Sequence, residues 1–223
     1  MSFKTTTLLG LLLVVAAFVF TAWLYPQLPN PMPSHWDTAG HVNGYLPKFW
    51  GAFLLPIIMA GTWILLSVLP RIAPRGYRLD SFMGAYGIIC LTILALLFGI
   101  ATFVLLAAKG ERVPMQHIVP VLMGLLLVIV GNYFGKLRKN FFAGIRTPWT
   151  LASDEVWTRT HRLGGWLFVT GGLASVAAGL FAPPASVPFI LIAVIGVLVI
   201  VPYAGSYFIY RRIEGLDDGK HPD

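Results

Sequence analysis

Six long stretches of this 223-residue chain contain no Asp, Glu, Lys or Arg. A helix needs roughly 20 apolar residues to cross a hydrocarbon core about 30 Å thick, and each stretch meets that length. The stretches are 5–24, 49–69, 82–108, 117–135, 163–182 and 188–210. Only 11% of the residues are charged, whereas soluble chains carry about a quarter. The sequence therefore predicts an all-α integral membrane protein with about six transmembrane helices.

The positions of Lys and Arg predict how these helices are oriented, because cytoplasmic loops carry an excess of basic residues. If the N-terminus is inside, the inner segments hold thirteen of the sixteen basic residues, and the outer segments hold only Lys48, Lys109 and Arg112. We therefore expect both termini in the cytoplasm. The formal net charge of the chain is +7. We expect its basic residues to bind anionic lipid headgroups on the inner face, and not nucleic acid.

The chain divides into two predicted membrane domains of three spans each. The amino-terminal domain, residues 1–115, includes an outer loop at 25–48, and the second domain, residues 116–223, includes an inner loop at 136–162. Small residues predict close helix packing in the second domain. They are the pair Gly131 and Gly135, and the row Gly171, Ser175 and Gly179. Between the first two, Asn132 is expected to be buried and to bond within the protein.

The outer loop is rich in proline and glycine, so we expect it to fold back compactly on the membrane surface. Its His35, Asp37 and His41 have side chains that bind divalent metals, but structural zinc sites usually have four ligands. No fourth ligand is near in the sequence, so we expect no metal. We expect instead a hydrogen-bonded loop whose histidines respond to pH.

The inner loop is basic and aromatic, a composition typical of a segment that lies along lipid headgroups. Thr147-Pro148 interrupts it, and Ser153 followed by Asp154 predicts a new helix, because a hydroxyl caps free amides and a carboxylate suits the positive helix end. On that helix Glu155 and Arg159 are four residues apart and are expected to pair. Two further expectations concern Arg146 and His161. Arg146 is expected to bind Asp154, Glu155 or a lipid phosphate, and His161 is expected to contact a helix end or a headgroup.

The inner stretch GNYFGKLRKNFFAGIRTPWTLASDEVWTRTHRLGG, residues 131–165, resembles the signature of the SdpI family of bacterial membrane proteins. The match comprises Gly131, Asn132, Asn140, Gly144 to Thr150, Trp157 and Thr160 to Arg162. The outer stretch LPNPMPSHWDTAGHVNGYLPK resembles the amino-terminal domain often fused to this family. The resemblance implies candidate partner-binding residues on the cytoplasmic side at Asn132, Asn140, Gly144, Arg146, Thr147, Pro148, Trp149, Trp157, His161 and Arg162. On the outer side it implies Pro33, His35, Trp36, Gly40 and Lys48.

The resemblance also implies a function in the bacterial cytoplasmic (inner) membrane. The expected activity is that of an immunity protein and receptor, which protects against a secreted killing peptide outside and holds a repressor protein inside. A small-solute transporter or channel remains the alternative, although no charged residue lies within a span where ions usually need one. No enzyme and no cofactor are expected, since the outer histidines and the inner Glu155 and His161 lie on opposite faces and cannot form one catalytic site.

Overall fold

The computed structural model describes residues 1–74 and 79–213, and six helices within them are long and apolar enough to cross a membrane. They are α1 (Phe3–Leu24), α2 (Lys48–Ile72), α3 (Met83–Lys109), α4 (Met115–Phe134), α6 (Asp154–Phe181) and α7 (Val187–Ile213). The prediction of an all-α protein with six spans is confirmed. Arg75, Arg78 and Lys220, which contribute to the orientation prediction, lie outside the described residues. The orientation itself stays a prediction.

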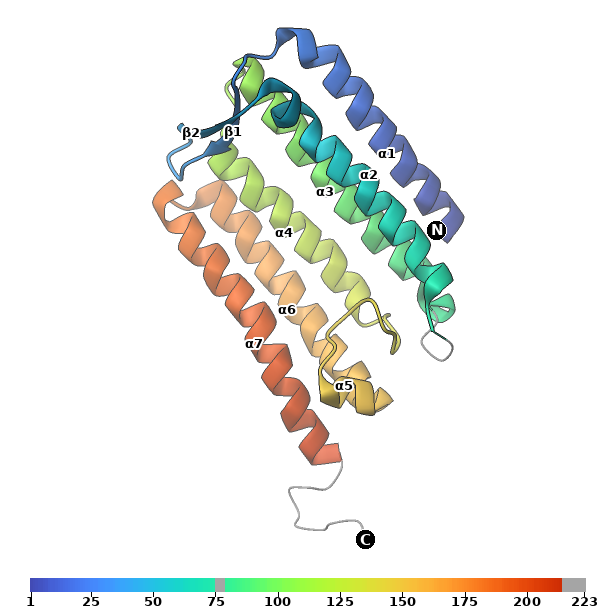
Figure 1. Ribbon diagram of the computed structural model, residues 1–223. Helices are drawn as coiled ribbons and strands as arrows, with labels where there is room; N and C mark the ends of the chain where they lie inside the picture. The colour runs from blue at the N-terminus through green and yellow to red at the C-terminus, as the bar shows by residue number, and fades with distance from the viewer. Residues whose placement is uncertain (75–78, 214–223) are drawn as a thin grey trace.

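The six helices run alongside one another (Figure 1). Helices α1, α2 and α3 contact each other, α6 lies between α4 and α7, and the contact of α3 with α4 joins the two groups. The start of α1 and the end of α7 lie towards one end of the bundle, and the outer loop lies at the opposite end (Figure 1). The division into domains 1–115 and 116–223 stays a prediction.

The outer loop forms an antiparallel hairpin of β1 (Met32–Trp36) and β2 (Val42–Leu46). The sequence analysis expected a compact loop but no strands. Met32 is fully buried against Leu24 and Ala52, so one side chain anchors the hairpin to the helices below it. Asp37 shapes the turn, because its Oδ1 accepts the backbone N–H of residue 39 at 2.9 Å and that of His41 at 2.8 Å. These bonds fix the shape of the turn, and its Gly40 lies against Gln116 of α4.

The tightest contact between spans is the one between α4 and α6, and it is made by glycine backbones. A Cβ on Gly124 would lie 2.5 Å from the carbonyl oxygen of Gly172, and a Cβ on Gly131 would lie 2.8 Å from that of Gly165. At the third contact, a Cβ on Gly179 would lie 2.9 Å from a carbonyl oxygen of α4. We call this contact the glycine seam. Its α6 members are seven residues apart, a spacing that keeps one face of a helix on its neighbour.

The predicted close packing at small residues is confirmed for Gly131, Gly171 and Gly179 but not for Gly135. Gly131 and Gly179 are in the seam, but a Cβ on Gly135 would meet nothing within 4 Å among the described residues. Gly171 faces α7 instead, where its Cβ would lie 3.0 Å from Val194. A four-residue spacing drifts off the contact line of these antiparallel helices, whereas a seven-residue spacing follows it.

We expect Gly172→Ala to destabilise the protein, because the added methyl would overlap the Gly124 carbonyl and force the two helices apart. Overpacking of this kind costs about 1–3 kcal/mol. Thermal unfolding of the purified protein in detergent micelles measures the effect. The matched control is Gly196→Ala in α7, where the added Cβ meets nothing within 4 Å of the described residues. Equal melting temperatures for the two variants would contradict the packing described for the seam.

Candidate functional site

The inner loop between α4 and α6 is built around a fully buried asparagine, Asn140. Its Nδ2 donates to the carbonyl oxygens of Arg138 and Ala143, each at 2.8 Å, and its Oδ1 accepts the N–H groups of Phe142 and Ala143 at 2.8 and 2.7 Å. All four bonds are to backbone groups within five residues. A buried polar side chain satisfied in this way fixes the path of the loop and leaves no group free for a partner.

His161 is also fully buried, and it joins the loop to α6. Its Nε2 accepts the N–H of Ile145 at 2.9 Å, and its Nδ1 lies 2.8 Å from the carbonyl oxygen of Trp157. Because a backbone N–H only donates and a carbonyl only accepts, the ring is neutral with its proton on Nδ1. The expectation that His161 contacts a headgroup or a helix end was wrong. The amide of Ile145 needs a buried acceptor, and the imidazole supplies it.

Gly144 is required by this arrangement. Its φ of 117° lies in the left-handed region, and a Cβ there would overlap the His161 ring. The glycine in the Gly-Ile-Arg-Thr-Pro-Trp match is therefore explained by local backbone geometry.

The short helix α5 (Pro148–Ala152) connects the loop to α7. Thr147 caps it, and the Thr147 and Thr150 side chains each bond the other's backbone N–H. Both hydroxyls are buried, and the Oγ1 of Thr147 lies 2.9 Å from the Oγ of Ser206 on α7. Trp149 packs its ring against Tyr203 and Tyr207 of the same helix, at 5.7 and 5.1 Å between centroids. The sequence analysis missed Ser206, which is a single hydroxyl in an apolar span.

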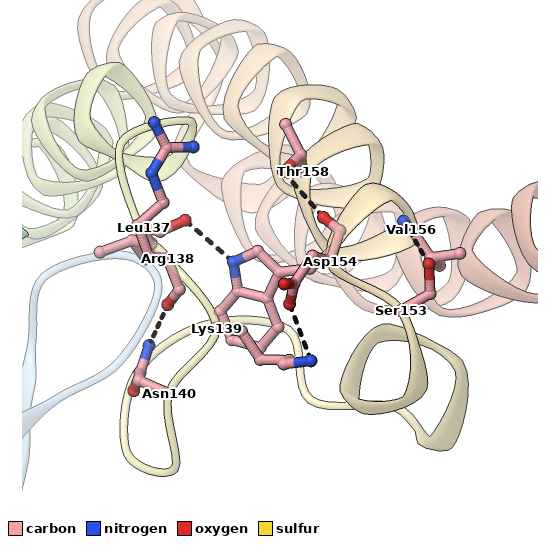
Figure 2. Close-up of polar contacts among 9 residues, drawn as sticks. Leu137, Arg138, Lys139, Asn140, Ser153, Asp154, Val156 and Thr158 are labelled. Carbon is pink, nitrogen blue, oxygen red and sulfur yellow. Dashed lines mark hydrogen bonds and ion pairs between the residues drawn. The ribbon is translucent and has the colours of Figure 1, made fainter. Parts of the chain in front are cut away.

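The beginning of α6 is held against the end of α4. Trp157 stacks on His161 at 4.0 Å between centroids and donates its Nε1–H to the carbonyl oxygen of Leu137 at 2.9 Å. Figure 2 shows this region, with the Lys139 ammonium 2.7 Å from the Asp154 carboxylate. Ser153 caps the helix by accepting the N–H of Val156, as predicted from the sequence. We call the buried residues Asn140, Thr147, Trp157 and His161, together with the half-buried Gly144, the inner knot.

Of three further expectations about this region, one is confirmed, one was wrong only about burial, and one is tested only in part. Glu155 pairs with Arg159, as predicted. Arg146 pairs with neither carboxylate, since Asp154 binds Lys139 and Glu155 binds Arg159, and its guanidinium donates to the carbonyl oxygen of Phe141. Its predicted contact with a lipid phosphate stays a prediction. Asn132 is exposed and not buried, and its Nδ2 donates to the carbonyl oxygen of Val128 at 2.8 Å. Gly131 of α4 faces Gly165 of α6, so the next residue, Asn132, lies on the outer surface of the helix pair.

The signature residues thus separate into two groups. The inner knot is used for folding, and Trp149 is half-buried against α7. Arg146, Pro148, Asn132 and Arg162 are exposed. Only these exposed side chains are available to a ligand or partner.

At the other end of the bundle, a pocket of about 390 Å³ opens between the hairpin and helices α3, α4 and α7. Its wall is mainly apolar and includes Trp36 from β1, Ile100 from α3, Val119 from α4 and Leu191 from α7. Polar groups stand at one side, among them Asp37. The sequence analysis singled out Trp36 but missed the helical residues, which resemble any other apolar residue of a span.

The other candidate outer residues lie around this pocket or support the hairpin. His35 lines the pocket and bonds through Nδ1 to the Oδ1 of Asn43. Gly40 contacts Gln116, Pro33 pairs with Tyr45 across the hairpin, and the Lys48 ammonium lies 4.8 Å from the centroid of the Tyr25 ring. Lys48 is therefore a support of the hairpin base.

The polar turn of the hairpin is held by Asp37. The hydrogen bond from the His41 backbone N–H lowers the pKa of the Asp37 carboxyl below its ordinary value. The turn is therefore stabilised while this carboxyl is ionised and loses that stabilisation as the pH falls through the lowered pKa. The His41 ring lies 3.5 Å from the same carboxylate. Within residues 1–74 and 79–213, no group of three or more His, Cys, Asp or Glu side chains is arranged to hold a metal ion.

Two segments of the chain match known protein families. Residues 136–206 match the SdpI/YfhL protein family, and residues 12–60 match a domain of unknown function, DUF1648. The chain is 24% identical over 208 residues to the immunity protein SdpI of Bacillus subtilis strain 168, across 93% of this chain and 97% of that protein.

A second relative matches a shorter segment. It is the uncharacterized membrane protein YbgB of the same organism, 39% identical over 46 residues, which are 21% of this chain and 50% of that protein. No solved structure matches the chain. The inner knot lies within or beside the SdpI/YfhL match, and β1 and β2 lie within the DUF1648 match. With its six apolar helices, the chain is a multi-pass protein of the bacterial inner membrane, and its residues 136–206 are similar to the SdpI/YfhL family.

Proposed function

We propose that this protein is an immunity protein that protects its cell by binding a secreted apolar or amphipathic peptide at the outer pocket. The similarity to the immunity protein SdpI along nearly the whole of both chains is the observation that carries the proposal. The activity is one of binding and needs no catalysis.

The outer pocket supports this proposal by its place and its chemistry. With both termini in the cytoplasm, as the basic residues predict, the hairpin and the pocket face the outside. A membrane-active peptide lies in the interface with its apolar side chains towards the lipid tails. The pocket offers those side chains an apolar wall at the same depth, and burial there contributes roughly 25 cal/mol per Å² of apolar surface. A peptide held in the pocket is withdrawn from the lipid that it would damage.

The pocket also lies between the two predicted domains. Trp36 and Ile100 come from residues 1–115, whereas Val119 and Leu191 come from residues 116–223. A peptide bound there contacts both domains, so it favours one position of the two domains relative to each other. Such coupling requires that the peptide bind the two arrangements unequally.

We infer that the inner loop carries the second activity, which is to hold a cytoplasmic repressor at the membrane. The inner knot supports this by fixing a surface that includes exposed Arg146 and the ring of Phe141, which is 54% exposed. Arginine and aromatic side chains are enriched where proteins bind one another. Because α5 is bonded to α7, and α7 also lines the outer pocket, the two faces share one helix.

The peptide proposal predicts that filling the pocket abolishes protection. Leu191→Trp places a large ring in the pocket, and we expect survival of cells exposed to the peptide to fall at least about tenfold, since one lost anchor typically costs more than 1.4 kcal/mol. The measurement is survival of a sensitive strain that expresses the protein and is exposed to candidate secreted peptides. The matched control is Ile192→Trp, at the neighbouring, 67% exposed position, which should protect like wild type.

The outcomes of this experiment separate the function from its site. If wild-type protein is present at normal levels and survival never depends on it, the immunity proposal fails for the peptides tested. If wild type protects and Leu191→Trp protects equally well, the immunity function stands and the pocket is the wrong site.

The repressor proposal predicts that Arg146→Ala releases the repressor without loss of protection. We expect the membrane-bound fraction of a tagged repressor, encoded beside the protein, to fall about tenfold, because a charged interface hydrogen bond is removed. Cell fractionation in the presence of peptide measures this. Arg212→Ala removes an exposed positive charge at the end of α7 and should leave the fraction unchanged. Equal loss in both variants would point to general charge and against a binding surface on the loop.

A further inference from the structure

The glycine seam leaves a notch on the lipid-facing side of α4 and α6, towards their inner ends. Its volume is about 240 Å³. Gly131 and Gly165 form the floor, where the two backbones touch, and Gly135 has no side chain that could fill the notch. The notch follows from close packing of the helices at a point where no larger residue fills the surface.

One wall of the notch is Arg162, an exposed arginine on α6. The basic side chains around it have partners: Arg159 pairs with Glu155, Lys139 with Asp154, and the Lys136 ammonium lies 4.6 Å from the Tyr133 ring centroid. Among residues 1–74 and 79–213, Arg162 has no hydrogen bond or ion pair. Its guanidinium is thus a strong donor that the described fold does not use.

The facing wall is Asn132 on α4. Its side chain gives one N–H to the Val128 carbonyl, which leaves the second N–H for another acceptor. Trp166 lies one helical turn beyond Arg162 on the same face of α6 and is 70% exposed. The notch is therefore lined by two polar donors and an amphipathic aromatic ring.

These donors are two of the exposed signature residues that are not part of the inner knot. The side chains of Asn140 and His161 use their polar groups in internal hydrogen bonds, whereas Arg162 makes none among the described residues and Asn132 keeps one N–H free. They come from different helices, thirty positions apart in the chain, and line the same notch. A ligand held there must accept hydrogen bonds, carry negative charge and extend an apolar part along Trp166.

We propose that the notch is a binding site for an anionic phospholipid. The Arg162 guanidinium donates to the phosphate in the paired geometry that arginine forms with phosphate oxygens. Asn132 donates its remaining N–H, and an acyl chain lies along Trp166 and Val169. Basic pockets between transmembrane helices on the cytoplasmic side bind anionic headgroups in this way. The proposal does not depend on the immunity function.

Native mass spectrometry of the full-length protein, released from detergent with added lipid, tests the site. We expect wild type to retain phosphatidylglycerol in preference to phosphatidylethanolamine with the same chains. Arg162→Gln should weaken phosphatidylglycerol binding about tenfold, because a charged hydrogen-bonding group is lost. Asn132→Ala should weaken it about threefold, as expected for one neutral hydrogen bond. Both side chains are exposed, and thermal unfolding of each variant verifies that the fold is retained.

Three controls decide the interpretation. Arg212→Gln removes the same charge from α7, away from the notch, and should change the affinity less than twofold. Trp166→Ala should weaken lipid binding, and inorganic phosphate at millimolar concentration should not displace the lipid. The proposal is overturned if Arg162→Gln binds phosphatidylglycerol like wild type, or if Arg212→Gln weakens binding equally. Displacement by inorganic phosphate would assign the notch to a free anion and would also overturn the lipid proposal.

Discussion

The close approach of the α4 and α6 backbones is the contact on which the inner half of this structure depends. Glycines at 124, 131, 165 and 172 let carbonyl oxygens of one helix lie within reach of the Cα atoms of the other. In lipid no hydrophobic force drives helices together, so close packing of this kind has to hold the pair. The seam sets the distance between the end of α4 and the beginning of α6. That distance allows Trp157 to reach the Leu137 carbonyl and His161 to reach the Ile145 amide.

The inner loop shows why a sequence signature does not identify a binding surface. Asn140 and His161 bond to backbone groups of the inner loop, and Gly144 is needed because the imidazole fills the space that a Cβ would occupy. An unpaired backbone amide buried at this place would cost about 1–3 kcal/mol, so each of these residues stabilises the loop. The exposed residues of the signature are those that a partner or lipid can contact. The signature of the loop therefore contains two kinds of residue: those that hold the loop in its conformation, and those that are exposed on its surface.

The sequence predicted the spans and the local helix features well, because both depend on neighbouring residues. The apolar stretches, the Ser153 cap and the Glu155–Arg159 pair are of this kind. The errors concern contacts distant in the chain. Nothing near His161 indicates that the amide of Ile145 will need it, and nothing near Asn132 indicates which side of α4 faces lipid. The hairpin was missed because prolines mask its strands, and the outer pocket was missed because four separate elements form its wall.

The seam also limits where the bundle can move. Helices locked backbone to backbone tilt together, so α4 and α6 form one stiff plate, to which α7 is attached through α6 and α5. The contact between this plate and α3 is less extensive than that between α4 and α6, and a short linker, residues 110–114, joins α3 to α4. Rocking at the contact with α3 would widen or narrow the outer opening and swing the inner loop at the far end of the same plate. A lever about 30 Å long, the span of a bilayer, turns a small change outside into a displacement inside.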